Sequence, residues 1–459
     1  MKPAVQLAGK RVLVVGLART GVATALFCAE RGARVAATEE NPEAKVAEAA
    51  ARLRAAGVAL ELGGHTQPTF LAQDLIVPSP GVPFHMPLLD AARGKGIPVW
   101  SEVELAWRFL RGPLAGITGS NGKTTTTALT GHLLATAGLP TIVAGNIGTP
   151  LISRVDTSSE VTVTVAELSS FQLENIAAFR PDISVLLNLT PDHLDRHASL
   201  EEYGRAKARI FENQTGDDAA ILNADDTALG PYAPHTPQVF RFSRLHPVGQ
   251  GAYVRGDQVV FRRDGKESVL LHRRDIGLRG DHNVENVLAA ACAAILAGAD
   301  ANFIAEGVRN FAGVEHRLEF VAEISGVKFF NYSKATNVDA TLKAIDAFPG
   351  RLFILLGGKD KGGDFTLLAR PLQRARSVAL LIGAASEKIE KQLHGAVEMI
   401  PAETIDRAIR LAFEQARPGD TVLLAPACAS FDQFENYEHR GRVFKQLVRD
   451  LEREAVNHA

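Results

Sequence analysis

One stretch of the chain combines glycines, a lysine and hydroxyl side chains in an order suited to phosphate binding. It reads Gly116-Ile117-Thr118-Gly119-Ser120-Asn121-Gly122-Lys123-Thr124-Thr125, after a short apolar segment and before a helical pattern at 128–137. In loops of this kind, backbone N–H groups and the helix N-terminus hold the phosphates of a nucleotide. The lysine contacts the outer phosphates, and the hydroxyl binds Mg²⁺. The stretch therefore predicts a nucleoside triphosphate site.

The glycine spacing of this stretch differs from that of the common phosphate loop, GxxxxGK[ST]. The common pattern requires a glycine five positions before Gly122, and this chain has Ile117 there. Its glycines fall at positions 116, 119 and 122 instead. The loop alone indicates nucleotide binding, and its unusual spacing restricts the families that fit.

Two further polar segments follow predicted strands. Glu167 comes directly after the strand at 161–166. A carboxylate at a strand end near a phosphate loop is a natural ligand of Mg²⁺. His193 lies in the segment 188–197, after the strand at 183–188. It is a candidate functional residue, but a capping or surface histidine fits the pattern equally well.

Two predicted helices carry polar residues that could belong to the same site. Lys207 lies on a helix at 203–207, where a lone lysine is normally solvated. Asn286 belongs to the segment 280–286, which opens an alanine-rich helix. In that segment Asn283 could be no more than an N-cap. Neither residue indicates a function by itself.

The first part of the chain begins with a strand, a tight turn and a helix start at 12–21, and Glu39 ends the next strand, 23 positions after Gly16. This arrangement resembles a dinucleotide-binding βαβ unit, whose acidic residue holds a ribose. The glycine pattern fails at Ala18, so a plain turn and an altered site for a uridine nucleotide both stay open. The rigid turn at 79–83 follows another strand, and its place at a carboxyl edge suits ligand contact.

The last part of the chain has two polar loops, at 357–361 and 426–434, that each follow a predicted strand. Open α/β sheets bind ligands at the carboxyl ends of their strands, so both loops are candidates, with ordinary turn chemistry as the alternative. Cys428 could suggest a thiol nucleophile. Because no histidine is assigned to activate it, we interpret this cysteine as a packing residue.

Short aliphatic runs alternate with helical patterns along the chain, which is typical of parallel α/β sheets. Buried strands are predicted at 11–16, 35–38, 75–77, 161–166, 183–188, 219–223, 352–357, 378–382 and 421–425. Breaks near 110–113 and 311–313 divide the chain into domains at 1–109, 110–313 and 314–459. Between 238 and 274 the sequence becomes short, charged and β-like, which predicts an antiparallel excursion in the middle domain.

Composition excludes several classes of protein. The 459 residues suggest about three domains, and the net charge of −2 argues against nucleic-acid and anionic-membrane surfaces. The longest apolar stretch, 287–299, is too short to cross a bilayer, and the N-terminus has no signal-peptide pattern. Three scattered cysteines favour a reducing cytoplasm over a disulfide framework.

Taken together, these segments resemble the Mur ligase family. The stretch 116–125 resembles the family's ATP loop, whose glycines have this unusual spacing, and 144–148, 167–174 and 192–196 resemble its central-domain motifs. The resemblance covers essentially the whole chain. It implies an α/β fold of three domains: a Rossmann-like N-terminal domain, a P-loop-type, mostly parallel central ATPase domain and a Rossmann-like C-terminal domain.

The resemblance implies a cytoplasmic, ATP-dependent amide ligase of peptidoglycan precursor synthesis, acting as a monomer. Its substrates would be UDP-N-acetylmuramoyl-L-alanine and D-glutamate, joined through an acyl phosphate, with ATP and two Mg²⁺ ions as cofactors. A sister ligase for another amino acid and a folate polyglutamate ligase are the nearest alternatives. A non-catalytic nucleotide switch and a nicotinamide dehydrogenase fit less well.

The resemblance also implies roles for single residues. The catalytic residues would be Lys123, Lys207, His193 and Lys334. ATP would be bound by Gly116, Gly119, Ser120, Asn121, Gly122, Lys123, Thr124, Thr125, Asn286 and Arg317. The UDP substrate would be bound by Gly16, Thr20, Glu39, Ser79, Gly81, Asn146, Ser169 and Gln172, with His193 near its alanyl end. D-glutamate would be bound by Thr336, Lys361, Ser430, Phe431 and Tyr437.

The metal ligands implied by the resemblance are Thr124, Glu167, His193 and Lys207, with Lys207 carbamylated. Addition of CO₂ to a lysine turns a cation into an anion that can bind a metal, whereas an ammonium group would repel one. One position departs from the family pattern: the family usually has an aspartate where this chain has Tyr332. A tyrosine can stack or donate a hydrogen bond, but it cannot supply an anion to a ribose.

Overall fold

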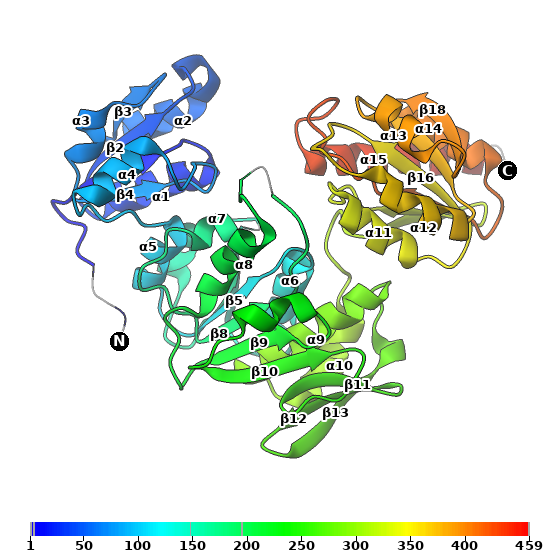
Figure 1. The fold of residues 1–459 in the computed structure, drawn as a ribbon, viewed down its shortest axis with the longest axis horizontal. Helices are drawn as coiled ribbons and strands as arrows, with labels where there is room; N and C mark the ends of the chain where they lie inside the picture. Colours follow the sequence, from blue (N-terminus) through cyan, green and yellow to red (C-terminus); the bar gives the residue numbers. More distant parts are fainter. Residues whose placement is uncertain (1, 3–4, 147, 194–195, 458–459) are drawn as a thin grey trace. The chain divides into compact units, whose positions relative to one another are not determined.

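The structure is a computed structural model that describes residues 2, 5–146, 148–193 and 196–457. It divides into two compact units, one of Met1–Asp275 with Glu285–Asn310 and the other of Ile276–Val284 with Phe311–Ala459. The first unit contains two sheets and the second unit contains one, and helices pack on all three (Figure 1). The predicted α/β class is confirmed, and most strand pairs are parallel.

The first sheet holds four parallel strands in the order β3-β2-β1-β4. Its strands are β1 (Arg11–Val15), β2 (Arg34–Glu39), β3 (Ala59–Leu62) and β4 (Leu75–Pro78). Its helices are α1 (Arg19–Glu30), α2 (Glu43–Ala55), α3 (Gln67–Leu71) and α4 (Pro87–Gly94). The central strand β1 is apolar and buried from Val12 to Val15, as expected for a parallel strand covered on both faces.

The second sheet holds nine strands in the order β13-β12-β11-β10-β9-β8-β5-β7-β6. Their bounds are β5 (Leu114–Thr118), β6 (Thr141–Gly145), β7 (Val163–Glu167), β8 (Ile183–Leu186), β9 (Ala219–Asn223), β10 (Gln238–Ser243), β11 (Gly251–Arg255), β12 (Gln258–Arg263) and β13 (Lys266–His272). The predicted antiparallel excursion is confirmed for the pairs β11–β12 and β12–β13. The prediction is wrong for β10, which pairs parallel to β9 because a crossover through 224–237 separates the two.

The helices of this part position most of the residues discussed below. They are α5 (Glu102–Phe109), α6 (Lys123–Thr136), α7 (Ser170–Leu173), α8 (Leu200–Ala208), α9 (Asp281–Leu296) and α10 (Ile304–Asn310).

All nine strands predicted from the sequence are confirmed. Several boundaries differ by one or two residues; β7, for example, begins at Val163, and the side chain of Val161 is 69% exposed.

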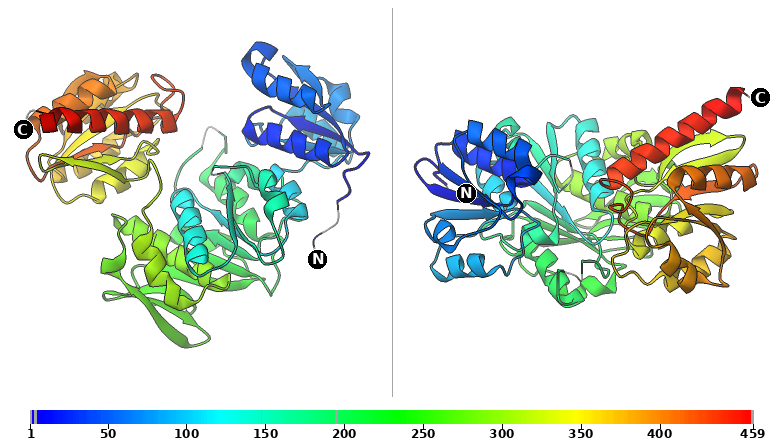
Figure 2. Two further views of the ribbon diagram at one scale, coloured as in Figure 1. Left: turned by 180° about the vertical axis from the view of Figure 1, so that it is seen from behind. Right: turned by 90° about the horizontal axis from the view of Figure 1, so that it is seen from above.

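The sheet of the second unit has the order β14-β15-β19-β16-β17-β18, and only β14 is antiparallel. Its strands are β14 (Glu319–Ile324), β15 (Val327–Asn331), β16 (Leu352–Gly357), β17 (Val378–Ile382), β18 (Glu398–Glu403) and β19 (Thr421–Leu424). Its helices are α11 (Val338–Asp346), α12 (Ala369–Arg374), α13 (Ser386–Leu393), α14 (Ile405–Gln415) and the long α15 (Tyr437–Asn457), drawn in red in Figure 2. Along β16, Ile354 packs in one apolar core and Phe353 in another, so both faces of this sheet are covered.

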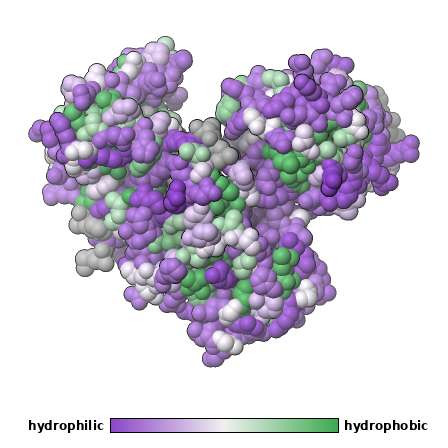
Figure 3. All heavy atoms as spheres, viewed as in Figure 1, coloured by the Kyte–Doolittle hydropathy of each residue, from purple (hydrophilic) through white to green (hydrophobic). Residues whose placement is uncertain are grey.

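The surface drawn in Figure 3 is mostly hydrophilic, with small separate apolar areas. Exposed large apolar side chains come from widely separated segments: Val161, Leu245, Val269, Phe303, Phe320, Leu367 and Phe431. Within the described part of the chain, the helices are all too short or too polar to cross a bilayer.

Two buried glutamates on α5 fix the segment that leads from the first sheet to the second. One Glu104 carboxylate oxygen accepts hydrogen bonds from the backbone N–H groups of 177, 178 and 179 (2.7–3.0 Å), and the other pairs with Arg108. Glu102 Oε1 accepts from the Ile152 N–H (2.6 Å), whereas its Oε2 is buried with no hydrogen-bond partner among the described residues. Burial raises the pKa of the Glu102 carboxyl from 4.5 to about 7.

Because Glu102 binds its proton more tightly in the folded protein, its ionisation destabilises the fold as pH rises from about 4.5 to about 7. The loss approaches about 3 kcal/mol above that window. We expect Glu102→Gln to unfold at a higher temperature than wild type at pH 8, with a much smaller difference at pH 5. Calorimetry at both pH values, with the exposed Glu30→Gln as control, measures this, and an equal difference at both values would contradict it.

Candidate active site

The predicted phosphate loop joins β5 to α6 and requires glycine at two positions. Gly122 adopts a left-handed conformation (φ 84°), and a Cβ there would lie 2.3 Å from Asn286 Oδ1. Gly119 has φ 153°, and a Cβ there would lie 2.9 Å from Leu187 Cβ. Helix α6 begins at Lys123, directly after Gly122. The sequence therefore builds a tight turn onto a helix N-terminus, the arrangement that favours anions.

Gly116 is the one predicted loop glycine that lies inside β5. A Cβ at this position would meet Leu168 Cδ1 at 3.0 Å and Pro181 Cγ at 3.1 Å. Close packing between β5 and its neighbours accounts for this glycine, and we do not assign it a contact with ATP.

A second polar segment, after β8, is hydrogen-bonded to the loop. Ser120 N–H donates to the Asn188 carbonyl (3.0 Å), and Asn121 N–H donates to Asn188 Oδ1 (2.8 Å). The Ser120 hydroxyl donates to the Thr190 carbonyl (3.0 Å) and accepts from the Thr190 N–H (2.9 Å). The structure thus brings together the segments 116–125 and 188–197, which were predicted separately.

Two lysines converge on one carbonyl of the loop. Lys123 Nζ donates to the Gly119 carbonyl (2.7 Å), and Lys207 Nζ, from α8, donates to the same oxygen (2.8 Å). Lys207 is fully buried, with its Nζ 4.4 Å from the centre of the Tyr203 ring. Burial, followed by the charge of Lys123, lowers the pKa of Lys207 well below its ordinary value. Burial and the neighbouring Lys123 therefore favour the neutral amine of Lys207 over its ammonium form.

Glu167 ends β7 beside the phosphate loop and is 3% exposed. Its strand pairs with β5 so that Glu167 faces Ile117 in register. Glu167 Oε1 accepts a hydrogen bond from Asn146 Nδ2 (2.8 Å), but Oε2 is buried with no hydrogen-bond partner within the described ranges. An unpaired buried carboxylate oxygen is costly, so the site fits a cation such as Mg²⁺, with the buried hydroxyl residue Thr124 two positions after Gly122.

His193 lies beside an aromatic cluster, and its backbone adopts a left-handed φ of 55°. Its ring centroid is 5.0 Å from that of Phe171 and 6.3 Å from that of Tyr203. The side chain is 42% exposed, with Nε2 3.7 Å from Asp192 Oδ2. Positions 194 and 195 of the predicted motif 192–196 lie outside the described residues.

Sequence reasoning missed the role of Arg196. Its guanidinium donates to Glu174 Oε2 (2.9 Å) and to the Val82 carbonyl (2.8 Å), and it packs over the Phe171 ring. Arg196 therefore connects the His193 segment to the turn at 79–83 that was predicted to contact ligand. No spacing rule could have found this contact, because more than a hundred residues separate the two segments.

Three other predicted residues have clear structural roles. Ser169 and Gln172 form the capping box of α7: the Gln172 N–H donates to Ser169 Oγ (3.2 Å), and the Ser169 N–H donates to Gln172 Oε1 (3.0 Å). Asn286 Oδ1 accepts from the Thr126 hydroxyl (3.2 Å) and lies against Gly122, so Asn286 belongs to the surroundings of the loop.

In the first sheet, three predicted residues meet at the carboxyl ends of β1, β2 and β4. The Ser79 hydroxyl donates to the Gly16 carbonyl (2.9 Å). Glu39 accepts from the Leu17 N–H (2.8 Å) and from the Asn41 N–H (2.9 Å). Burial raises the pKa of Glu39, but these hydrogen bonds outweigh burial and lower it, so the carboxylate is ionised at neutral pH. Thr20 is half-buried on α1, and Gly81 is exposed.

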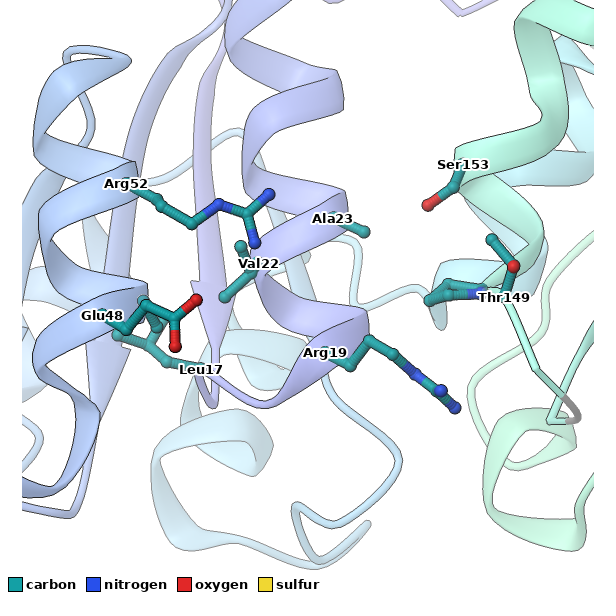
Figure 4. A pocket seen from close by; sticks show the side chains of 10 residues that line it. Leu17, Arg19, Val22, Ala23, Glu48, Arg52, Thr149 and Ser153 are labelled. Carbon is teal, nitrogen blue, oxygen red and sulfur yellow. The ribbon is translucent and has the colours of Figure 1, made fainter.

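A cavity of about 510 Å³ lies next to the turn that joins β1 to α1. It is lined by Leu17, Arg19, Val22, Ala23, Glu48, Ala49, Arg52, Thr149, Pro150 and Ser153, and Figure 4 shows its walls on α1, α2 and the segment 149–153. None of the predicted UDP-substrate residues lines this cavity, although Leu17 and Arg19 flank Ala18, between Gly16 and Thr20. Helices α1 and α2, which pack on the first sheet, and the segment 149–153, which follows β6 of the second sheet, thus border the same cavity.

In the second unit, three loops come together at the carboxyl ends of adjacent strands. They are the β15 loop (332–337), the β16 loop (358–364) and the β19 loop (425–436). Lys359 and Ala429 exchange backbone hydrogen bonds (2.8 and 3.0 Å). The Ser333 hydroxyl donates to the Tyr437 carbonyl (2.8 Å), and Lys334 Nζ lies 3.9 Å from the centre of the Tyr437 ring.

The predicted D-glutamate residues are distributed over these loops and the start of α15. Ser430 is 2% exposed, Thr336 and Tyr437 are half-buried, and Lys361 and Phe431 are exposed. A buried hydroxyl next to exposed cationic and aromatic side chains suits a small carboxylate ligand.

Two further residues of the second unit, Cys428 and Tyr332, are buried. Cys428 is buried in an apolar core, and desolvation raises the pKa of its thiol to about 12, which agrees with its interpretation as a packing residue. Tyr332 is buried in the core, where burial raises its pKa and the charge of Arg317 lowers it. The tyrosine is therefore a core residue that interacts with Arg317.

Three protein-family models match the chain. They are described as Mur ligase MurD-like, N-terminal domain (residues 10–101), Mur ligase middle domain (117–294) and Mur ligase, glutamate ligase domain (316–428). The chain is 54% identical over 447 residues to the UDP-N-acetylmuramoylalanine--D-glutamate ligase of Acidobacterium capsulatum, which covers 96% of this chain and 97% of that protein. It is 50% identical over 444 residues to the protein of the same name from Koribacter versatilis, with coverage of 96% and 98%.

A solved structure of low sequence identity has a similar fold. The MurF ligase from Thermotoga maritima in complex with ADP is 16% identical and matches with a TM-score of 0.61, over 98% of this chain and 100% of that chain. The domain order predicted from the sequence agrees with the order of the three matching models.

Proposed function

The chain belongs to the Mur ligase family, and we propose that it joins D-glutamate to UDP-N-acetylmuramoyl-L-alanine in an ATP-dependent step of peptidoglycan precursor synthesis. The relatives at 54% and 50% identity have this activity in their names. The single observation that carries the proposal is the convergence of Lys123, Lys207 and Glu167 around one phosphate loop. A nucleotide switch would have no need for the buried lysine and the buried carboxylate.

In the proposed reaction, the alanyl carboxylate attacks the γ-phosphorus of ATP, giving an acyl phosphate and ADP. The amine of D-glutamate then attacks the acyl carbon, and phosphate leaves. Because two anions must meet in the first step, positioning and charge neutralisation are most of the protein's task. We assign this task to Lys123 in the first unit and Lys334 in the second.

Mg²⁺ would be held by Thr124 and Glu167, and a second ion by His193 and a carbamate on Lys207. When bound, such ions neutralise the charge on phosphate oxygens. The orphaned Oε2 of Glu167 supports the first site. The crowding of the Lys207 ammonium against that of Lys123 supports the carbamate, since CO₂ addition would replace repulsion between cations by attraction.

The other predicted residues would each contact one of the three ligands. Gly119, Ser120, Asn121, Gly122, Thr125, Asn286 and Arg317 would contact ATP, and Gly16, Thr20, Glu39, Ser79, Gly81 and Asn146 would contact the UDP substrate. D-glutamate would bind to Thr336, Lys361, Ser430, Phe431 and Tyr437. The capping box keeps Ser169 and Gln172 in place at the start of α7, and we propose that they contact the UDP substrate there.

We also propose a monomeric enzyme in the cytoplasm. All three cysteines, Cys28, Cys292 and Cys428, are buried free thiols, which supports a reducing compartment.

The amino-acid specificity is tested by phosphate release in the presence of ATP and UDP-N-acetylmuramoyl-L-alanine. We expect D-glutamate to stimulate release strongly, and L-alanine, meso-diaminopimelate and L-lysine to have little effect. Preference for one of the other three would make the chain a sister ligase. ATP binding without amino-acid-dependent release would support a switch instead.

A further inference from the structure

A buried arginine is hydrogen-bonded to the loops at the carboxyl ends of β15 and β19, and the loop after β16 packs against it. Arg440 lies in the first turn of α15 and is 1% exposed. Its Nε donates to Ser333 Oγ (3.0 Å), and its Nη2 donates to the Ser333 carbonyl (2.8 Å). The guanidinium therefore holds both the side chain and the backbone of the residue before Lys334.

The same guanidinium holds the β19 loop. Nη1 donates to the Cys428 and Ala429 carbonyls (3.2 and 3.3 Å), and Nη2 donates to the Cys428 carbonyl (3.2 Å). Ser430, the proposed substrate contact, follows directly. Gly358, with φ 129°, closes the β16 loop against this group: a Cβ there would lie 3.2 Å from Arg440 Nη1 and 2.2 Å from the Ala429 carbonyl.

These hydrogen bonds use every donor that Arg440 has. A guanidinium carries five N–H groups, and the structure gives it five hydrogen bonds, all to neutral oxygens. Arg440 therefore has no donor left for a substrate. It acts on the site only through the loops that it holds.

The charge of Arg440 is in an electrostatically unfavourable position for the stability of the fold. The side chain takes part in none of the ion pairs found within the described ranges, and it lies at the N-terminal end of a 21-residue helix, where the helix dipole disfavours a cation. Burial lowers the pKa of Arg440 to about 10, so the group is still charged at neutral pH. The charge of Asp432 offsets part of this effect, but Arg440 forms no ion pair with it within the described ranges, so an anionic ligand nearby would add favourable negative charge.

We propose that Arg440 is a positioning residue of the amino-acid site, which sets the β15, β16 and β19 loops around a dicarboxylate substrate. This inference rests on the proposed function, because the dicarboxylate is D-glutamate there. Its fixed positive charge also favours an acidic amino acid over a neutral one.

Steady-state kinetics of the full chain with Arg440→Met and Arg440→Lys test the proposal. A misplacement of about 1 Å in a substrate-positioning group can cost about 100-fold. We expect Arg440→Met to raise the KM for D-glutamate by about 30- to 100-fold while the KM for ATP changes less than threefold. Arg440→Lys keeps the charge but reaches fewer carbonyls, so we expect a smaller rise. Arg442→Met, on the exposed side of the same helix, is the matched control.

The outcomes separate the two proposals. If wild type shows no D-glutamate-dependent phosphate release, the proposed function is wrong. If wild type shows it and Arg440→Lys and Arg440→Met keep the wild-type KM for D-glutamate, Arg440 is not a positioning residue. An equal rise of both KM values, or a loss of thermal stability without a change in KM, would likewise overturn the inference.

Discussion

Replacing Lys207 by alanine is expected to remove most of the ligase activity, by about 10²- to 10³-fold in kcat, the range found when a charge-stabilising group is deleted. Lys207 is fully buried, and its Nζ lies 2.8 Å from the Gly119 carbonyl of the phosphate loop. If a carbamate on this lysine supplies the negative charge, a small carboxylate can enter the space left by the side chain. We therefore expect added acetate or propionate to restore part of the activity of Lys207→Ala.

The controls distinguish a lost charge from a damaged fold. The same acids should leave wild type unchanged, and Arg205→Ala, on the exposed side of α8, should keep near-normal activity. The thermal unfolding of Lys207→Ala should stay cooperative, since the truncation leaves the backbone hydrogen bonds of α8 in place and alanine favours a helix. Full activity of Lys207→Ala without added acid would contradict the carbamate role, and so would a loss that no short carboxylic acid restores.

The sequence was sufficient to predict strands that are buried on both faces of a sheet. The run at 352–357 became β16, with every residue buried, because a continuous aliphatic run is stable as a central parallel strand. By contrast, β3 and β18 were not predicted. Neither of them is a continuous aliphatic run, and in β18 only Ala402 is buried. The direction of β10 was also beyond local patterns, because pairing direction depends on the crossover that precedes the strand.

The candidate site was predictable where the chemistry is local. The phosphate loop could be found because its glycines, Lys123 and Thr124 lie close together in the sequence and all serve to bind a nucleotide. Arg440 could not be found in this way. It stands in an ordinary amphipathic helix, and its role arises only because it is hydrogen-bonded both to Ser333, far away in the sequence, and to the loop just before its own helix. Arg196 and Glu102 are similar cases, since each acts through backbone groups far away in the sequence.

Glu167→Gln is expected to lower kcat by about 10²- to 10³-fold and to raise the Mg²⁺ concentration needed for half-maximal activity. Glutamine keeps the shape of the side chain and can still accept the hydrogen bond from Asn146 Nδ2. What it removes is the charge on Oε2, which is buried and has no hydrogen-bond partner within the described part of the chain. A titration of activity against Mg²⁺, with the exposed Glu160→Gln as control, measures this effect.

The stability of the same variant decides what the carboxylate is for. A buried, unpaired carboxylate costs about 1–3 kcal/mol, so a purely structural residue would have no reason to keep it. We expect the melting temperature of Glu167→Gln without Mg²⁺ to equal or exceed that of wild type, while activity falls steeply. Lower stability together with a normal Mg²⁺ requirement would show instead that Glu167 serves the fold. Loss of activity without loss of stability would mean that the chain maintains this charge for the cation.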